Sequence, residues 1–408
     1  MRRGTNLPAI GGFNQSVVLD LIRRTPGGLS RVEIAEKTGL APQTVSNASR
    51  RLIEDGLIIE GGKQITGPGK PRVLLQLDPL SRYAVGVHLD PTIITYVLLD
   101  LRANIVAHEQ ARTPKVTGPG DVLNVISTTI DALIERAGIS RDKLLGIGIA
   151  APGPIDSARG VIVDPPLLED WRDVPLRDSI SEATGLPVLL EKDVIAAAVA
   201  ELWTAGDETR EDFAFFYLGT GIGVGLTLDG DVLRGFTGNA GEGGTLVIAA
   251  DNLPERRRSN MLGHLATPQY LVAQAVDEGV LATAPDPHDL SAVDDGFSEL
   301  VALAESGDAG ADRIMTRAAG FIAAGLVSIV NLLDVSEIVF GGPAWSRFAR
   351  RYRDVIDDRV AQSPDRKTHH RISMRDSAVG EDVAAVGAAC LVLDAVMSPR
   401  PSTLLISN

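Results

Sequence analysis

The N-terminal part of the sequence contains three consecutive helical patterns separated by two short breaks, and this arrangement restricts the fold more than any other feature. The first pattern covers Asn14–Arg24 and stops at Thr25-Pro26-Gly27-Gly28. Ser30, followed three residues later by a glutamate, has the spacing of a capping box and predicts the start of a second helix. That helix is expected to end at Gly39, and Pro42 suits the first turn of a third. Two helices joined by a tight, glycine-containing turn predict a helix-turn-helix.

The third predicted helix has an apolar side, which begins at Val45, and a polar side. The polar residues are Gln43, Thr44, Ser46, Asn47, Arg50 and Arg51. Gln, Asn and Arg side chains make paired hydrogen bonds to base edges, whereas Ser and Thr usually contact phosphates. The pattern favours recognition of double-stranded DNA in the major groove, chiefly by Gln43, Asn47 and Arg50. The alternative is the solvated face of a small helical bundle.

Two strand-like runs follow this helix, Leu57–Glu60 and Val73–Leu77, with a Gly- and Pro-rich stretch between them. The stretch carries Lys63, Lys70 and Arg72. A narrow basic hairpin suits the negative potential of the minor groove, so we expect a wing that contacts DNA. A flexible linker that happens to be basic is the alternative.

Charge is distributed unequally along the 408 residues, although the net charge is −14. Residues 1–80 hold 11 Lys and Arg against 7 Asp and Glu, while the rest of the chain is strongly acidic. This asymmetry predicts a small DNA-binding domain on a body that avoids DNA. The single cysteine, Cys390, excludes an intramolecular disulfide. The longest charge-free apolar stretch, Ala318–Leu333, is short for a bilayer span, so we expect a buried helix, no membrane partner and a cytoplasmic protein.

The remainder of the chain shows two series of β-runs, each followed by helical patterns. The first series predicts strands at Tyr83–Leu89, Ile93–Leu99, Asn104–Ala111 and Leu144–Ala150, with a helix at Asp121–Ala137. The second predicts strands at Phe213–Leu218, Gly223–Leu228, Val232–Arg234 and Glu337–Phe340. We expect an α/β fold of two lobes with a ligand cleft between them. The expected domains are a winged helix-turn-helix at 1–80, a body at 81–398 and a flexible tail at 399–408. The first lobe spans about 81–200 plus the C-terminal helix, and the second about 201–380.

Several glycine-containing segments of the body resemble the ROK family (repressors, open reading frames and kinases), in the order that the family has them. They are Gly146–Asp156, Gly185–Asp193, Leu218–Gly225, Gly238–Glu242 and Ile338–Gly342. The resemblance implies an actin-like ATPase fold, and with the winged head it implies a regulator of the xylose or N-acetylglucosamine repressor type. It further implies a homodimer or tetramer that binds a palindromic operator and responds to a small-molecule effector, a sugar or a sugar phosphate.

The resemblance also locates two phosphate loops. Where the family's kinases have a turn resembling Gly-x-Asp-x-Gly-Gly-Thr, this chain has Gly86–Thr92, with His88 for the carboxylate and Asp90-Pro91 for the glycine pair. An added negative charge and a lost N–H donor oppose phosphate binding. The second loop keeps Gly219, Thr220, Gly221 and Gly223, which either bind phosphate or serve only the geometry of a hairpin turn. We therefore expect no nucleotide cofactor and no phosphoryl transfer.

The sugar site implied by the resemblance is also altered. Asp193 aligns with the family's catalytic base and is expected to be vestigial, and Glu242 aligns with a sugar-binding carboxylate. Lys192 and Thr245 replace the family's Asn and His, and Gly263 falls near a lost Glu. The candidate effector-binding residues are Lys192, Asp193, Asn239, Glu242 and Thr245.

The family's zinc cluster has no counterpart, because residues 254–261 contain no thiol. We expect no structural metal. The three consecutive cations Arg256–Arg258 either form a solvated loop or bind an anion.

These observations favour a DNA-binding transcriptional regulator, expected to be a repressor, with a non-catalytic body that senses an effector and dimerises. One alternative is an active ATP-dependent hexose kinase with a DNA-binding head. The other is a regulator controlled by a protein partner that docks on the acidic body, with the segment Asp277–Asp295 as a candidate mobile contact.

Overall fold

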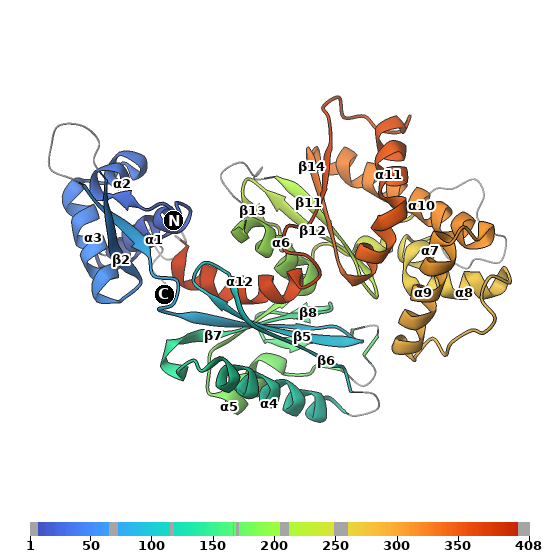
Figure 1. Ribbon diagram of the computed structural model, residues 1–408, viewed down its shortest axis with the longest axis horizontal. Coiled ribbons are helices and arrows are strands. Elements are labelled where there is room, and N and C mark those ends of the chain that lie inside the picture. Colours follow the sequence, from blue (N-terminus) through green and yellow to red (C-terminus); the bar gives the residue numbers. More distant parts are fainter. Residues whose placement is uncertain are drawn as a thin grey trace.

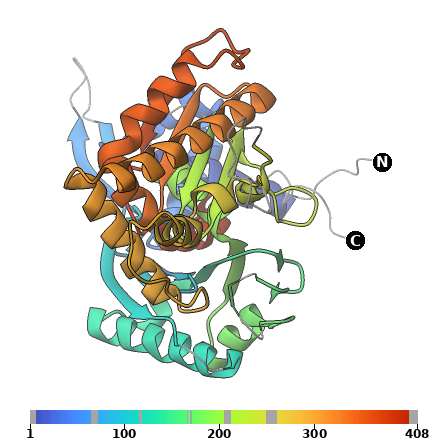
Figure 2. The ribbon, with the colours of Figure 1, turned by 90° about the vertical axis from the view of Figure 1, so that its right-hand side faces the viewer.

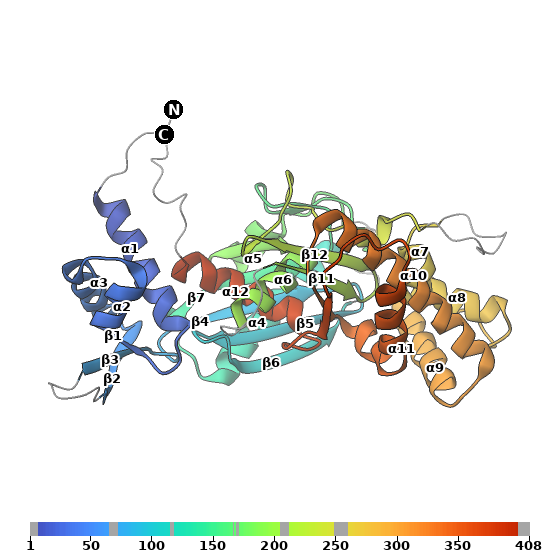
Figure 3. The same ribbon diagram turned by 90° about the horizontal axis from the view of Figure 1, so that it is seen from above.

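The computed structural model describes residues 7–64, 72–114, 118–165, 167–168, 171–204, 212–248 and 260–398. A small N-terminal head lies at one end of an elongated molecule, and the helices around α8–α11 lie at the other (Figures 1 and 3). Between them stand two five-stranded sheets. The mixed α/β architecture confirms the predicted fold class.

The head consists of α1 (Leu7–Arg23), β1 (Leu29–Ser30), α2 (Arg31–Thr38), α3 (Pro42–Glu54), β2 (Ile58–Gln64) and β3 (Arg72–Leu77). The predicted capping box is present, since the Glu33 amide donates to Ser30 Oγ and the Ser30 amide donates 2.8 Å to the Glu33 carboxylate. Gly39 ends α2 with φ 70°, a conformation that favours glycine. The helix α1 begins seven residues before the predicted Asn14, and β2 is longer than expected.

The first lobe is built on a sheet with strand order β10-β7-β4-β5-β6. Its strands are β4 (Tyr83–Leu89), β5 (Ile93–Asp100), β6 (Ile105–Arg112), β7 (Leu144–Ala151) and β10 (Val188–Lys192). The helices are α4 (Pro119–Ala137) and α5 (Leu176–Thr184), with a 3-10 turn η1 (Arg141–Lys143) and a short hairpin of β8 (Ile155–Asp156) and β9 (Val161–Ile162). The predicted strands agree with these bounds to within one residue at each end.

The second lobe has the sheet order β13-β12-β11-β14-β15. Its strands are β11 (Phe213–Leu218), β12 (Ile222–Leu228), β13 (Asp231–Val232), β14 (Glu337–Gly341) and β15 (Ser373–Asp376). The helical elements are η2 (Gly243–Thr245), α7 (Gly263–Ala266), α8 (Pro268–Asp277), α9 (Leu290–Glu305), α10 (Ala309–Leu333) and α11 (Pro343–Gln362). Figure 2 shows the helices of this lobe stacked above the sheet and helices of the first.

Three predictions for the second lobe were wrong in their extent. The strand predicted at Val232–Arg234 lies at Asp231–Val232. The helix predicted from Ala318 begins at Ala309, because Asp308 caps it by accepting from the Ala311 amide at 2.8 Å. The segment Asp277–Asp295 is not a continuous loop, since α9 starts at Leu290. By length and composition α10 could cross a membrane, but half of its apolar window is buried and its residues belong to the core of the second lobe. We therefore assign it as a core helix.

Two apolar helices, α6 (Asp193–Thr204) and α12 (Val383–Met397), pack against each other between the two sheets (Figure 1). Their backbones approach so closely that a Cβ added at Gly387 would lie 1.8 Å from the carbonyl oxygen of Ala196. On the other side of α12, a Cβ at Gly148 of β7 would lie 1.7 Å from the Ala388 carbonyl oxygen. Glycine is required at both positions, because a side chain at Gly387 would separate α12 from α6 and one at Gly148 would separate β7 from α12. The head, α6 and α12 share one continuous hydrophobic core.

Candidate DNA-binding head and interlobe site

The helix α3 separates its apolar and polar residues as the sequence predicted. Val45, Ala48 and Leu52 are buried against the rest of the head, while Gln43, Asn47, Arg50 and Arg51 are exposed and Thr44 and Ser46 are half-buried. The Gln43 amide donates to Asn47 Oδ1 at 3.2 Å, so these two side chains lie side by side on the outer face. Arg50 is 3.9 Å from Glu54, and both side chains are about two-thirds exposed. Such an exposed pair is weak, so Arg50 can move to an external partner at little cost.

The wing is an antiparallel pair in which Gln64 of β2 faces Arg72 of β3. Arg72 is exposed at the far end of this pair. Lys70 and the side chain of Lys63, both predicted to contact DNA, lie outside the described residues. Neither can therefore be placed relative to α3.

The head is fixed to the body through Arg23 at the end of α1. The Arg23 guanidinium carbon lies 3.9 Å from the centre of the Trp203 ring, and Nη1 donates 3.2 Å to the Trp203 carbonyl oxygen. Asp20 holds the same guanidinium at 2.8 Å. A second contact joins the body to the end of α3, where Arg82 donates to the Asp55 carbonyl oxygen at 3.3 Å. Because Trp203 belongs to α6, the head is attached to the helix that begins at Asp193.

The first phosphate loop is occupied by its own carboxylate. Asp90 Oδ1 accepts hydrogen bonds from the Thr92 amide at 2.8 Å and from Thr92 Oγ1 at 2.5 Å. Asp90 Oδ2 accepts from Thr220 Oγ1 of the second loop at 3.3 Å. A carboxylate thus takes the donors of both loops and joins the two lobes. Nucleotide phosphates do not fit here, because they would meet a buried negative charge.

The second loop is organised as a hairpin turn between β11 and β12. The Gly219 amide donates to the Gly221 carbonyl oxygen at 3.0 Å, so this N–H group already has a hydrogen-bond acceptor within the turn. A Cβ at Gly223 would lie 2.1 Å from Val194 Cγ1 at the start of α6. These contacts support the interpretation that the glycines serve backbone geometry rather than phosphate binding.

Tyr217, just before this turn, fills the space beside it. A Cβ at Gly219 would lie 2.8 Å from the Tyr217 ring, and the His88 and Tyr217 rings meet edge to face with centres 6.2 Å apart. Tyr217 Oη is buried and has no hydrogen-bond partner among the described residues. Burial, followed by the charges of Asp90 and Asp193, raises the pKa of Tyr217 well above its ordinary value, so the phenol is neutral.

Lys192 crosses the site where the resemblance implies a sugar. Its Nζ donates to Glu242 Oε1 at 2.5 Å and to the carbonyl oxygens of Asn239 and Ala240 at 3.4 and 3.3 Å. The Lys192 side chain is 4% exposed and that of Glu242 is 53% exposed. Lys192 therefore pairs with Glu242 rather than with the neighbouring Asp193.

Two of the predicted effector residues have structural partners instead. The Asn239 side chain accepts from the Ile155 amide at 2.7 Å and donates to the Ile155 carbonyl oxygen at 2.7 Å. Thr245 is exposed, and its hydroxyl donates to the Glu242 carbonyl oxygen at 2.7 Å. Neither residue lines either of the interlobe cavities, and Gly263 starts α7 outside both.

Asp193, the first residue of α6, faces the inner cavity beside Tyr217. Its Oδ1 accepts from the Val194 amide at 2.7 Å. Burial raises the pKa of the Asp193 carboxyl, although His88 and Lys192 oppose this. A carboxyl with a raised pKa could act as a base, but the loops that would hold a phosphoryl donor are blocked.

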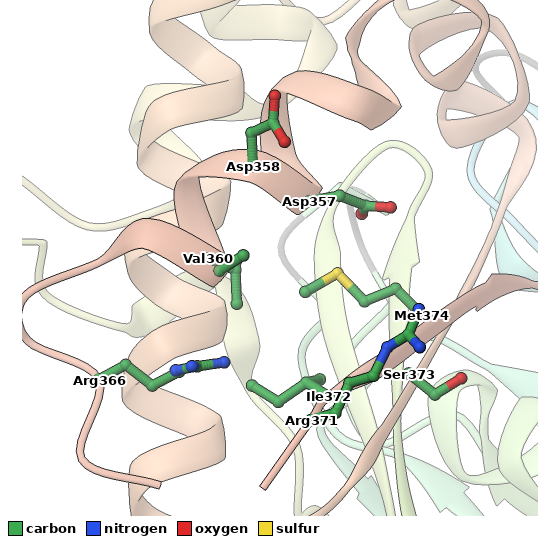
Figure 4. Close-up of a pocket in the computed structure, with 9 residues that line it drawn as sticks. Asp357, Asp358, Val360, Arg366, Arg371, Ile372, Ser373 and Met374 are labelled. Carbon is green, nitrogen blue, oxygen red and sulfur yellow. The ribbon is translucent and has the colours of Figure 1, made fainter. Parts of the chain in front are cut away.

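Two cavities lie between the lobes and share Asp90, Leu167, Tyr217 and Thr220 as walls. The inner one measures about 110 Å³ and reaches Asp193 and Lys192, while the outer one measures about 420 Å³ and opens past Arg112 and Arg347. A larger cavity of about 550 Å³ lies away from the cleft, between the end of α11 and β15 (Figure 4). It is lined by carboxylates and guanidinium groups together, including Asp357, Asp358, Arg366 and Arg371. No segment that resembles the family contributes to it.

Metal binding finds no support in the part of the chain that the structure describes, where no group of His, Cys, Asp and Glu side chains could hold an ion. Arg256–Arg258 and most of the cysteine-free stretch lie outside the described residues.

Sequence reasoning missed Arg23, Trp203 and Tyr217. No local pattern marks the first two, because their contact joins residues 180 positions apart. Tyr217 had a signal, since it lies two residues before Gly219 of the second glycine loop, but an aromatic residue at that place is ordinary in a buried strand.

Comparison with known proteins supports this architecture in both parts. Residues 84–395 match the ROK family, and residues 16–59 match a winged helix-turn-helix DNA-binding family. A xylose repressor from Caldicellulosiruptor bescii is 24% identical over 379 residues, which cover 91% of this chain and 93% of that protein.

Solved structures resemble the chain over different lengths. A ROK family transcriptional regulator, a homologue of the Escherichia coli MLC protein, has a TM-score of 0.76 at 23% identity and covers 95% of this chain and 97% of its own. A ROK hexokinase from Thermus thermophilus has a TM-score of 0.60 at 28% identity and covers 76% of this chain and 97% of its own. The xylose repressor and the transcriptional regulator both match almost the whole chain, head included. The chain therefore belongs to the ROK family, and it is a DNA-binding transcriptional regulator with a kinase-like body.

Proposed function

We propose that this protein is a cytoplasmic repressor that binds a palindromic operator as a homodimer and releases or tightens it when a small polar ligand enters the interlobe cleft. The observation that carries the proposal is the position of α6. It begins at Asp193 in the inner cavity and ends against the head, where Trp203 contacts Arg23. We take residue 80 as the boundary between head and body.

The outer face of α3 supports the DNA-binding part of the proposal. Gln43, Asn47 and Arg50 are exposed on one side of a helix whose other side is buried. The first turn of α3 has no side-chain cap, so its amides are available to a DNA phosphate. We assign base contacts to these three residues, phosphate contacts to Thr44, Ser46 and Arg51, and minor-groove contacts to the wing with Arg72.

The contacts of α6 support coupling between cleft and head. Beyond Asp193 and Trp203, its buried Glu201 binds Arg375 of β15 at 2.7 Å and also accepts from Ser377. One rigid helix thus touches the cavity, the second lobe and the head. A relative rotation of the lobes would move Trp203 and change the distance between the two heads of a dimer.

Selection of binding sites from random DNA duplexes by the full-length protein tests the proposal. We expect an inverted repeat with half-sites one or more helical turns apart, about 10.5 base pairs each. Asn47→Ala should lose the preference at one position of each half-site, while Arg102→Ala, on the exposed β5–β6 turn of the body, should leave it unchanged. Enrichment of no sequence, or equal enrichment by both variants, would contradict the proposal.

The kinase alternative is supported only by Asp193 and the second glycine loop. Asp90 opposes it because its carboxylate accepts the donors of both loops. Tyr217 opposes it because its ring packs against Gly219 of the second loop. ATP consumption in the presence of hexoses, abolished by Asp193→Asn, would establish it. A regulator controlled by a protein partner would bind its operator but show no response to ligands that enter the cleft.

A further inference from the structure

The cavity between the lobes contains a polar group that lacks a partner. Tyr217 is 4% exposed, and its Oη has no hydrogen-bond partner among the described residues although it lies at the junction of both cavities. Leaving a buried hydroxyl unpaired costs about 1–3 kcal/mol. The position therefore suits an atom supplied by a ligand.

Two carboxylates, Asp90 and Asp193, line the inner cavity with this hydroxyl. Asp90 is 7% exposed and accepts hydrogen bonds only from the neutral groups of Thr92 and Thr220. Asp193 accepts from the Val194 amide, and the nearby Lys192 ammonium is already bound to Glu242. Among the described residues, no ion pair forms to either carboxylate.

An ammonium group has the chemistry that this site lacks. It carries one positive charge and three N–H donors and has no acceptor, so it can donate to both carboxylates and to Tyr217 Oη together. A phosphate or carboxylate would instead add a negative charge to a buried acidic site. A neutral hydroxyl would supply one donor and leave the charges uncompensated.

We propose that the inner end of the interlobe cavity binds the ammonium group of a small organic amine, held by Asp90, Asp193 and Tyr217. This inference rests on the proposed function and names the class of its effector. The outer cavity of about 420 Å³ holds the rest of such a molecule. Because Asp90 also bonds Thr220 across the lobes, a bound amine competes for that carboxylate and loosens the contact between them.

A matched series of probes tests the proposal by isothermal titration calorimetry of the full chain in an amine-free buffer. The probes are 4-amino-1-butanol, 1,4-butanediol and 4-hydroxybutyrate, which share one length and differ in charge. We expect the amine to bind at least roughly tenfold more tightly than the diol, and the carboxylate not to bind. Equal affinities, or tighter binding of the carboxylate, overturn the proposal. Competition by K⁺ at equal strength would assign the site to an inorganic cation and also overturn it.

Two variants assign the contact to these residues. Tyr217→Phe removes only Oη and should lower the affinity for the amine about fivefold. Asp90→Asn keeps an acceptor for Thr92 but removes the charge, so it should lower this affinity at least about tenfold. Asp365→Asn, on the exposed loop after α11, is the matched control and should bind like the unaltered protein. Unchanged amine binding in both cleft variants refutes the assignment.

Operator affinity measured in parallel separates this inference from the proposed function. If the amine fails to bind while the protein still selects an inverted repeat, the effector class is wrong and the DNA-binding function stands.

Discussion

The guanidinium of Arg23 lies 3.9 Å from the centre of the Trp203 ring and donates to the carbonyl oxygen of the same residue. One side chain of the head thus binds both the ring and the backbone at the end of α6. Arg23 is 9% exposed in this position, so the interaction is largely shielded from water. Together with the contact between Arg82 and Asp55, it joins the head to the body, and we expect it to carry part of the proposed coupling.

Arg23→Ala is expected to release the head from the body. Loss of a shielded cation–π contact and a charged hydrogen bond costs about 1–2 kcal/mol, roughly a tenfold rise in the undocked population. Chemical modification of the chain's single cysteine measures this undocking, because Cys390 is fully buried in the core shared by α1 and α12. Burial also raises the pKa of the Cys390 thiol, which keeps it unreactive. The rate of modification by a disulfide reagent in native buffer should rise about tenfold, in proportion to undocking.

Arg24→Ala is the matched control for this experiment. Arg24 also binds Asp20, at 2.9 Å, but its side chain is 60% exposed. Among the described residues, no hydrogen bond or ion pair joins it to α6. Its removal should leave the labelling rate of Cys390 unchanged. Equal rates in both variants would show that Arg23 does not hold the head.

Removal of Glu242 should destabilise the body because it leaves the buried Lys192 ammonium without a counter-charge. We expect Glu242→Gln to cost about 1–3 kcal/mol in the free energy of unfolding. The double variant Lys192→Met with Glu242→Gln removes both charges and should recover most of this loss. Denaturant unfolding measures both effects. Asp131→Asn, which breaks an exposed pair with Arg141, should change the free energy of unfolding by less than about 0.5 kcal/mol. A loss as large as that of Glu242→Gln would show that burial of Lys192 does not cause the effect.

Ser30→Ala should destabilise the head in a pH-dependent manner. Losing the cap of α2 costs about 1 kcal/mol. The hydrogen bonds from the Ser30 side chain and backbone lower the pKa of Glu33 below its ordinary value of 4.5. A carboxyl whose pKa is lower in the folded than in the unfolded protein stabilises the fold at pH values above the pKa of the unfolded state. This contribution is lost as the pH falls through the pKa of the folded state. The difference in thermal stability between the two proteins should therefore be constant near neutrality and shrink below about pH 4.5. A difference that grows on acidification would refute this.

The base-reading and phosphate-binding assignments on the head can be separated by salt. Asn47→Ala should weaken binding to the selected operator by about 1–3 kcal/mol and leave binding to unrelated DNA unchanged. Arg51→Ala removes an exposed cation assigned to a phosphate, so it should weaken both alike and reduce the salt slope of the affinity by about one unit. Fluorescence anisotropy at several salt concentrations measures both quantities. A loss confined to the selected operator for Arg51→Ala would contradict its assignment to a phosphate.

The sequence predicted local features well because they depend on neighbours along the chain. The capping box of Ser30 and Glu33, the polar face of α3 and most strands of both sheets follow from spacing within a few residues. The edge strands β10 and β15 were not predicted. The start of α10 was missed because its first turns are polar, with Asp312 and Arg313, and only the later turns are uniformly apolar. The role of Asp90 as an internal substitute for a phosphate depends on Thr220, which lies 130 positions away. The pairing of Lys192 with Glu242 likewise joins residues 50 positions apart, so no local pattern could predict it.

Asp193 is expected to reduce the stability of the free protein at neutral pH. Burial is the largest cause that raises the pKa of its carboxyl above the ordinary value of 3.8. A carboxyl whose pKa is higher in the folded than in the unfolded protein lowers the stability when it ionises. This cost is absent at pH values below the pKa of the unfolded state and complete at pH values above the pKa of the folded state. Asp193→Asn keeps the acceptor for the Val194 amide and removes the charge, so it should raise the melting temperature at pH 7 by ~2 °C. The gain should disappear as the pH is lowered toward the ordinary pKa. A variant that melts earlier at pH 7 would show that the attraction of His88 and Lys192 outweighs the cost of burial.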